Sequence, residues 1–327
     1  RRLFTSSSIL IKMNYDKLKD SLAGCYVTVP TLFNDSDLSL NLDGMRKHVN
    51  FLIAGGIKTG TGVLLAGGAA GDFSSMEIEE RIKVCETVVR ETNGRVPVVF
   101  GAQTTNTQEL IKLAKAGQKA GAQFIQVSPP FYFDHTEIDF LEYIKSVAEV
   151  TNIGIIIYNT YWTSLNVSNK LIDDLSKIPQ VIGLKWSSPD SGTLDFEKTI
   201  QNYSKRFSII DNQLRFVTSH MLGATSIEVH TCNYWPEWGV SILKLLKDKN
   251  YLKVQNEMMR VVAPFMELWM EMEKYTSGDG YLDKLCMELV GMDSSRNRPP
   301  TRDLRNQFRD KAQKMMQQTG VPNIGRK

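Results

Sequence analysis

The chain has 327 residues, 42% of them hydrophobic and 23% charged, which is typical of a globular protein with a sizeable core. A formal net charge of +3 is too small to indicate nucleic acid or an anionic membrane as a partner. No apolar run approaches the roughly 20 residues of a membrane-spanning helix, so small-molecule chemistry is the expectation.

The beginning of the chain differs in composition from the rest. Residues 1–12 (RRLFTSSSILIK) are basic, rich in serine and free of acids. Such a segment is typical of a disordered leader, and it also resembles the end of an organellar transit segment. We therefore expect a leader over residues 1–14 of a cytoplasmic protein, with the mitochondrial matrix as the alternative location.

Eight short apolar runs alternate with amphipathic stretches from Gly24 onward. The runs predict strands at residues 25–33, 61–68, 96–102, 124–130, 154–159, 181–187, 207–212 and 225–232. The segments between them have helical spacing, and several end in glycine, as residues 107–121 do. This alternation predicts an α/β fold, one (β/α)8 TIM barrel over residues 15–247. A doubly wound open sheet is the alternative, but no GxGxxG follows the first strand.

The strand signals stop after Lys247. The remaining sequence predicts three helices, at residues 251–275, 281–290 and 302–318. We therefore expect a C-terminal helical extension over residues 248–327.

Lys185 is the first candidate catalytic residue. Strand alternation puts it on the face opposite to the bulky apolar set of Ile182, Leu184 and Trp186, which suits packing under helices. Lys185 is then predicted to point into the barrel at the C-terminal end of strand six, where such barrels carry their active sites. Apolar surroundings disfavour an ammonium and favour the neutral amine that attacks a ketone. The alternative is a lysine that reaches solvent at the barrel mouth.

Tyr158 is predicted to lie beside this lysine. It ends strand five on the same face as Gly154 and Ile156, and neighbouring strands are about 4.8 Å apart. A phenol at that place can carry protons to and from a Schiff-base intermediate. The alternative is a buried tyrosine that is hydrogen-bonded for stability.

Two acids stand where a barrel normally has aliphatic side chains. Asp211 shares a strand face with Phe207 and Ile209, and Glu228 shares one with Ser226 and His230. We expect both acids to line the same cavity. They either form an ion pair with Lys185 or another cation, or they contact substrate hydroxyls or move a proton.

The glycines, cysteines and histidines give weaker indications of function. The glycine-rich segment at residues 67–75 either presents backbone N–H groups to an anion or is a plain tight turn. Four scattered cysteines without a CxxC pair and four histidines without an HExxH spacing predict buried free thiols, no metal site and no cofactor.

Taken together, these residues resemble the dihydrodipicolinate synthase and N-acetylneuraminate lyase family of class I aldolases. The likeness covers residues 24–300 and is strongest in GGAAGD, VPVVFGAQTTNTQELIKLAKAGQKAGA, SPPFY, IIIYN and GLKWSS, in the family's order. The resemblance implies that Lys185 carries the Schiff base and that Tyr158 relays protons. It also implies a homotetramer made of two tight dimers, in which Tyr132 is supplied across a subunit interface. The backbone amides of Ala69 and Ala70 would hold the carboxylate of a 2-oxo acid.

Departures from the family pattern bear on the substrate. Ala69 and Ala70 replace paired hydroxyl residues, and the loop at residues 158–164 lacks the arginine that binds a second carboxylate. Asp211 and Glu228 replace a glycine and an aliphatic residue. We therefore expect a Schiff-base lyase, an aldolase or dehydratase, that acts on pyruvate or a larger 2-oxo acid and does not make dihydrodipicolinate. The acids would suit a sugar acid, whereas Phe73, Trp162 and Trp235 would suit an aromatic aldehyde, and both readings stay open. The alternative function is an inactive barrel that binds such an acid as a sensor or scaffold.

Overall fold

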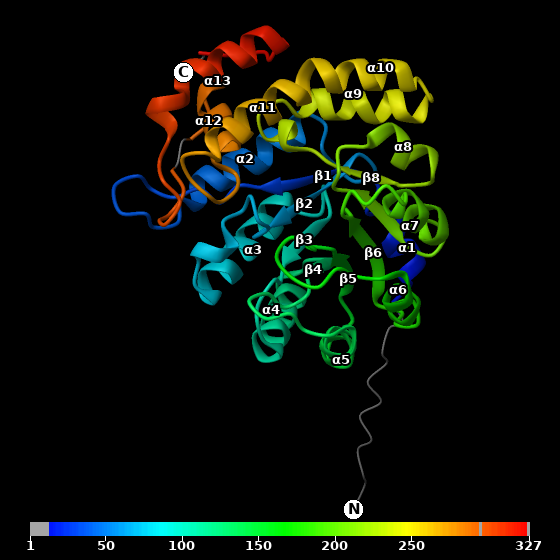
Figure 1. The fold of residues 1–327 in the computed structure, drawn as a ribbon. Coiled ribbons are helices and arrows are strands. Elements are labelled where there is room, and N and C mark those ends of the chain that lie inside the picture. Colours follow the sequence, from blue (N-terminus) through cyan, green and yellow to red (C-terminus); the bar gives the residue numbers. More distant parts are fainter. Residues whose placement is uncertain (1–12, 294–295, 326–327) are drawn as a thin grey trace, which may run out of the picture.

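Eight parallel strands close into a barrel in the computed structural model, which describes residues 13–293 and 296–325. Each strand pairs with the next along the chain, and the eighth pairs with the first (Figure 1). The strands are β1 (Gly24–Val29), β2 (Gly62–Ala66), β3 (Val98–Gly101), β4 (Phe124–Val127), β5 (Gly154–Tyr158), β6 (Val181–Trp186), β7 (Ser208–Asp211) and β8 (Ser226–Glu228). The predicted (β/α)8 barrel is confirmed, and the open-sheet alternative is excluded.

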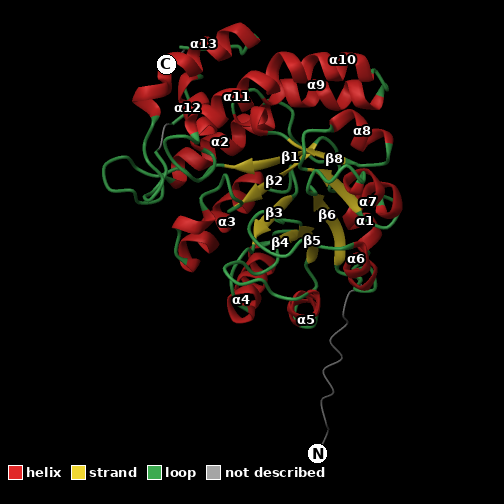
Figure 2. Cartoon of the chain, viewed as in Figure 1, coloured by secondary structure: helices red, strands yellow, loops and turns green. Residues whose placement is uncertain are grey.

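A ring of helices surrounds the strands (Figure 2). These helices are α2 (Leu42–Ala54), α3 (Ile78–Thr92), α4 (Thr107–Ala120), α5 (Glu137–Ala148), α6 (Asn169–Leu175), α7 (Asp195–Tyr203), α8 (Phe216–Met221) and α9 (Pro236–Lys247). Helix α4 shows how the sequence sets their ends. The Asn106 side chain accepts a hydrogen bond from the Glu109 amide at its start, and Gly121, with φ of 97°, ends it in the left-handed conformation.

The barrel interior is filled with side chains and is therefore a packed core. Nine buried apolar residues meet there: Leu22, Tyr26, Val63, Leu65, Val99, Phe124, Ile156, Ile182 and Ile210. Helix α1 (Tyr15–Asp20) packs Tyr15 and Leu18 against this cluster and covers the N-terminal end of the barrel. Space for a substrate is left at the opposite end, where the strands terminate.

The C-terminal helices cover the side of the barrel formed by β1, β2 and β8 (Figure 1). They are α10 (Tyr251–Glu257), the π-helical η3 (Met258–Val262), α11 (Ala263–Met272), α12 (Tyr281–Leu289) and α13 (Arg305–Thr319). The π-helical turn ends two residues before Pro264, whose ring nitrogen donates no hydrogen bond. Leu285 and Phe308 share one hydrophobic cluster with Val27 and Val29 of β1, so the C-terminal part and the barrel have a continuous core.

Some expectations concern the chain as a whole. Residues 1–12 of the predicted leader lie outside the described residues. Within the described part, no helix has both the length and the apolar character needed to cross a bilayer. The four cysteines are free and buried.

Candidate functional site

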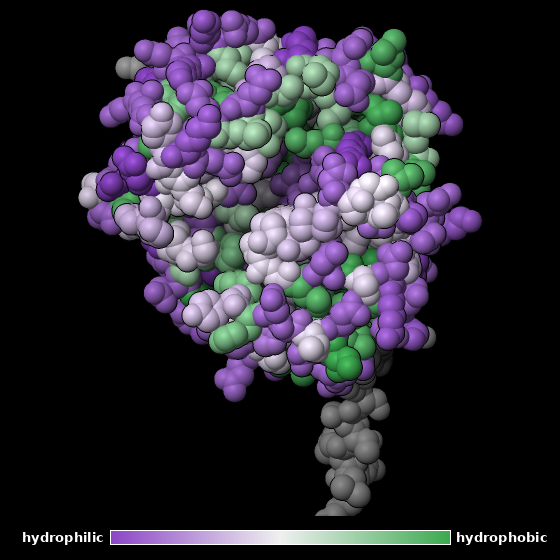
Figure 3. Space-filling view, viewed as in Figure 1, coloured by the Kyte–Doolittle hydropathy of each residue, from purple (hydrophilic) through white to green (hydrophobic). Residues whose placement is uncertain are grey.

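A cavity of about 600 Å³ opens at the C-terminal ends of the strands. Its walls come from β1, β5, β6 and β8, from the loops after β2, β5 and β7, and from α11 with the loop that follows it. In the view of Figure 3, the surface is hollowed near its centre and bordered by both hydrophilic and hydrophobic side chains.

Lys185 lies inside this cavity, on a strand that contains one irregularity. In the pairing of β5 with β6, Ile155 faces Val181 but Ile156 faces Gly183, so one residue of β6 is skipped. Ile182 consequently points into the barrel core, which corrects the outward position that simple alternation predicts for it. Lys185 remains inward as predicted, and only 3% of the residue is exposed.

The Lys185 amine is surrounded by one carboxylate and two aromatic rings. Its Nζ lies 2.6 Å from Oε2 of Glu228. The centroid of the Tyr158 ring is 4.5 Å from Nζ, and that of Tyr26 is 5.1 Å away. The amine is therefore enclosed, in contrast to the solvent-reaching alternative.

Tyr158 pairs directly with Lys185 across β5 and β6. Asn212 Nδ2 donates to its phenol oxygen at 3.3 Å. Burial raises the pKa of Tyr158 above its ordinary value, and the negative charge of Glu228 raises it further. Tyr158 thus keeps its proton at neutral pH and can donate it to an oxygen in the cavity.

Glu228 connects the lysine to β1. Its Oε1 accepts a hydrogen bond from Thr28 Oγ1 at 3.0 Å, while Oε2 pairs with Lys185. Glu228 therefore forms the ion pair with Lys185 that was one of its two predicted roles. A carboxylate in this place can also accept the proton that the lysine must lose before it attacks a ketone.

Asp211 lies outside the cavity, which corrects the prediction that it lines the cavity with Glu228. It shares a face with Phe207 and Ile209 as expected, but this face packs under the helices, and Ile210 is the residue that enters the barrel core. Its carboxylate accepts hydrogen bonds from Ser219 Oγ and the Gln213 amide, both at 2.7 Å. The prediction failed because both faces of this strand are apolar, so that polarity does not distinguish inside from outside.

Ala69 and Ala70 line the cavity in the turn after β2. Among the described residues, neither of their backbone N–H groups has a hydrogen-bond acceptor. The turn is held by a bond from the Gly71 amide to the Gly68 carbonyl at 3.0 Å and by Asp72, which has a positive φ of 57°. Two backbone donors without an acceptor at the wall of this cavity are suited to a carboxylate.

The other end of this turn is anchored by the C-terminal part of the chain. Lys284 Nζ donates to Oδ2 of Asp72 at 2.8 Å, and Asn297 Nδ2 donates to its Oδ1 at 2.7 Å. Lys284 is 1% exposed. Burial lowers its pKa, and the Asp72 charge opposes this effect.

Tyr132 does not reach the cavity of its own chain. It lies in the loop after β4 with 87% of its surface exposed and a φ of 86°, and its ring contacts that of Phe133. Its assignment to a neighbouring subunit's site stays a prediction.

Several lining residues had no predicted role. They are Thr28, Asn212, His230, Met266, Trp269, Glu273 and Asp279. His230 could have been found, because it continues the face of β8 that carries Glu228. The residues from α11 and the loop after it gave no signal in the sequence, since nothing local indicates which part of a C-terminal extension covers a barrel mouth.

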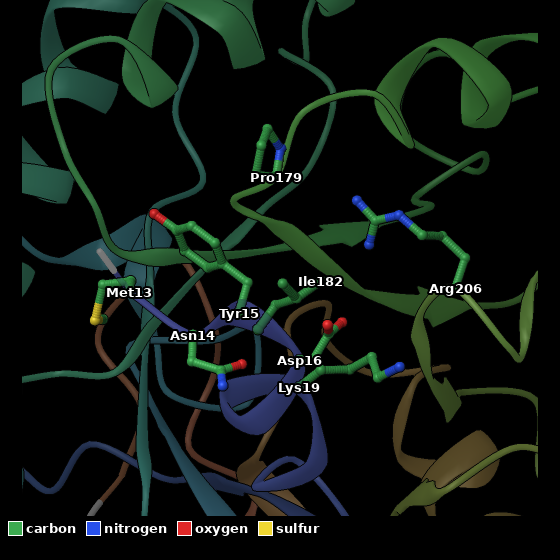
Figure 4. A pocket seen from close by; sticks show the side chains of 8 residues that line it. All are labelled: Met13, Asn14, Tyr15, Asp16, Lys19, Pro179, Ile182 and Arg206. Carbon is green, nitrogen blue, oxygen red and sulfur yellow. The ribbon is translucent and has the colours of Figure 1, made fainter. Parts of the chain in front are cut away.

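A second pocket, of about 500 Å³, lies at the N-terminal end of the barrel beside α1 (Figure 4). Its cations are already used within the fold. Lys19 donates to the Lys205 carbonyl at 3.3 Å, and Arg206 donates to the Ser176 carbonyl at 2.8 and 3.1 Å. No set of reactive groups converges there among its lining residues, so this pocket is not the candidate active site. In the described ranges, no group of three metal-binding side chains occurs either.

An enclosed lysine beside a phenol and a carboxylate, at the C-terminal mouth of a (β/α)8 barrel, is the arrangement expected of class I lyases, which form a Schiff base with their substrate. Comparison with known sequences agrees with this class. The chain belongs to the dihydrodipicolinate synthetase family, whose family model matches residues 21–319.

Individual relatives are named 4-hydroxy-tetrahydrodipicolinate synthases. The chain is 34% identical over 173 residues to the 4-hydroxy-tetrahydrodipicolinate synthase of Neisseria meningitidis serogroup B, which is 53% of this chain and 58% of the relative. It is 31% identical over 170 residues to the enzyme of Pseudomonas aeruginosa, which is 52% of this chain and 56% of that protein. The matched region thus spans somewhat more than half the length of these curated relatives.

Solved structures show the same fold. Dihydrodipicolinate synthase from Oceanobacillus iheyensis has a TM-score of 0.80 at 20% identity and covers 93% of this chain and 98% of its own. YagE of E. coli K12, solved in complex with pyruvate, has a TM-score of 0.80 at 22% identity, covering 91% and 99%. CdNal from Clostridium difficile, in complex with mannosamine, has a TM-score of 0.78 at 18% identity, also covering 91% and 99%.

Proposed function

We propose that this protein is a Schiff-base-forming lyase that acts on pyruvate or a larger 2-oxo acid. The observation that carries the proposal is the Lys185 amine, enclosed in the barrel mouth with Glu228 at 2.6 Å and the Tyr158 ring at 4.5 Å. Family membership supports the same general chemistry.

The residues divide the work of Schiff-base formation. Glu228 accepts a proton from the Lys185 ammonium, and the freed amine attacks the ketone carbon. One amine proton moves to the carbonyl oxygen, which gives the carbinolamine. Tyr158 donates a second proton to that oxygen, which leaves as water and produces an iminium on Lys185, and the proton held by Glu228 then restores the phenol. The iminium then accepts the electron pair when the bond between carbon 3 and carbon 4 breaks, or when a proton leaves carbon 3.

The carboxylate of the 2-oxo acid would be bound at Ala69 and Ala70. Ala69 and Ala70 line the same cavity as Lys185, and backbone N–H groups without an acceptor need no side-chain hydroxyl to bind an anion. This explains how two alanines are compatible with 2-oxo acid binding.

The rest of the cavity favours a partner without a second carboxylate. Of the described lining residues, Glu228, Glu273 and Asp279 are acids, whereas Lys185 and His230 are the cationic groups, and each of these two is already paired with an acid. No arginine is present among them. We therefore propose an uncharged aldehyde portion, hydroxylated or aromatic, and a reaction other than dihydrodipicolinate synthesis.

Borohydride trapping tests the proposal. Incubation with pyruvate and borohydride should add irreversible mass to a peptide that contains Lys185, and Lys185→Ala should lose this labelling. Labelling that persists in the variant would refute the assignment of the lysine. Thermal stabilisation by pyruvate, without an adduct or any product, would instead favour a binding protein that acts as a sensor or scaffold.

A further inference from the structure

His230 forms an oriented pair with Asp283 at the cavity wall. It stands two residues after the end of β8, at the start of the 3-10 helix η2 (His230–Asn233). Its Nδ1 lies 3.1 and 3.2 Å from the two carboxylate oxygens of Asp283 in α12. Asn233 Nδ2 donates to the same carboxylate at 2.9 Å and fixes its position. The Asp283 carboxylate thus orients the imidazole, and Asn233 in turn fixes the carboxylate.

The other nitrogen of this ring is free to serve the cavity. Among the described residues no hydrogen bond involves His230 Nε2, although His230 lines the cavity and its side chain is 20% exposed. The ring packs against Phe265 and Trp269 of α11, at centroid distances of 5.8 and 6.1 Å. With Nδ1 anchored at Asp283, Nε2 is the polar atom left to meet a substrate.

The surroundings keep this imidazole protonated. Burial alone would lower its pKa, but the charge and hydrogen bond of Asp283 outweigh burial, and Asp279 and Glu228 add to them, so that the pKa of His230 rises to about 10. Glu273 of the loop after α11 also lines the cavity. At neutral pH the ring carries a proton on each nitrogen.

Lys185 is consumed when it forms a Schiff base. Of the lining residues, His230 is then the remaining cationic donor on the side formed by β8 and α11. We propose, on the basis of the proposed lyase function, that His230 is the acid that protonates the oxygen on carbon 4 of the substrate.

The step balances as follows in the direction of carbon–carbon bond formation. The enamine nitrogen on Lys185 supplies its electron pair, carbon 3 bonds to the aldehyde carbon, and the carbonyl π pair moves to the aldehyde oxygen. That oxygen takes the Nε2 proton, which leaves a 4-hydroxyl group, a neutral imidazole and an iminium on Lys185. In cleavage the neutral imidazole accepts the hydroxyl proton, and every step runs in reverse.

Two half-reactions separate this role from that of Lys185. Exchange of the carbon 3 protons of pyruvate in D2O, followed by NMR, requires the enamine but no aldehyde. Pyruvate consumption with acetaldehyde, glyceraldehyde or benzaldehyde requires the carbon 4 oxygen as well. His230→Gln should keep exchange within about 3-fold of the parent enzyme and should lower aldehyde addition about 100-fold or more.

A second variant keeps the ring and changes its charge. Asp283→Asn still offers an oxygen to Nδ1, but it lets the pKa of His230 fall toward the ordinary value. Aldehyde addition should therefore lose activity at a lower pH than in the parent enzyme, while proton exchange keeps its pH profile. His220→Gln is the matched control, because His220 contacts Tyr251 at 3.2 Å and does not line the cavity.

Several results would overturn the assignment. They are addition at the parent rate in His230→Gln, parallel loss of exchange and addition in that variant, an unchanged pH profile in Asp283→Asn, or a parent enzyme that exchanges protons yet consumes none of the aldehydes. A parent enzyme that shows neither adduct nor exchange would refute the lyase function itself, and the role of His230 with it.

Discussion

At the scale of single residues, the ion pair of Lys185 and Glu228 matters more for catalysis than for stability. A buried ion pair gives little net stability, because desolvation of both charges offsets their attraction. A pair that shares one mobile proton is useful in a different way, since it converts an inert ammonium into a nucleophile. We infer that Glu228 is retained for chemistry, and the next variant tests this.

Glu228→Gln should lower kcat about 100-fold or more, because an amide cannot take the Lys185 proton. Asp211→Asn is the matched control. Asp211 is also a buried acid at the end of a strand, but it faces Ser219 outside the cavity, so its kcat should stay within about 2-fold. Steady-state kinetics with pyruvate and an aldehyde would measure both. Equal losses in the two variants would show that Glu228 acts through folding alone.

His230 also predicts a pH dependence of stability. Its pKa rises to about 10 in the folded protein, above the ordinary 6.5, so its pairing with Asp283 stabilises the fold fully below about pH 6.5. This contribution is lost as pH rises from there through about 10. In Asp283→Asn the free energy of unfolding should change less over this interval. Urea unfolding at several pH values measures the difference, and parallel curves for the two proteins would contradict the pKa.

At the scale of elements, the sequence predicted the regular strands and helices well, but it did not predict the local irregularity within a strand. The eight strands and the C-terminal helices follow from apolar periodicity, which every element shows independently. The position of Ile182 was missed because a skipped residue in β6 changes no residue type, only the register. Lys185 and Tyr158 were placed correctly, since they follow the irregularity and keep the alternation with each other. The orientation of Asp211 was predicted wrongly because each face of β7 carries an isoleucine, Ile209 on one and Ile210 on the other, so polarity does not show which face is inside.

The partners from the C-terminal part could not be predicted at all. Asp283 lies 53 residues from His230, and Lys284 lies 212 residues from Asp72. Such pairs depend on how α12 is docked on the barrel, and the helical pattern of α12 indicates only which of its faces is buried. The next prediction therefore tests a contact that α12 makes with the barrel.

Lys284→Met should weaken 2-oxo acid binding, because it removes the cation that holds Asp72 and leaves a buried carboxylate in the turn that carries Ala69 and Ala70. The apparent KM for pyruvate should rise about 10-fold with a smaller change in kcat, and the melting temperature should fall. Asp72→Asn combined with Lys284→Met should recover part of the loss, since no buried charge is then unpaired.

Lys47→Met provides the matched control for this prediction. Lys47 pairs with Asp293 at 3.3 Å on the surface, where an ion pair contributes little. Its removal should leave both KM and melting temperature nearly unchanged. A fall in melting temperature alone, with an unchanged KM, in Lys284→Met would show that 2-oxo acid binding does not depend on this anchor of the turn.

At the scale of the whole molecule, the exposed aromatic loop after β4 is the feature that one subunit does not explain. Tyr132 and Phe133 are 87% and 68% exposed, and Tyr132 holds a positive φ that a tyrosine rarely adopts. Exposed aromatic side chains on a constrained loop are typical of an interface. We propose that two subunits exchange these loops and that Tyr132 completes the partner's proton relay within a homotetramer.

Complementation between inactive subunits tests this exchange. Tyr132→Phe and Lys185→Ala should each be nearly inactive alone. In a mixed dimer, however, the site with an intact Lys185 receives an intact Tyr132 from the Lys185→Ala subunit. Random reassembly of equal amounts makes half of the dimers mixed, each with one working site, so about a quarter of the parent activity should return. If Tyr132 serves only its own subunit, mixing will restore nothing, and if it serves no site, Tyr132→Phe will be active without mixing. Sedimentation will show whether mixed oligomers had formed.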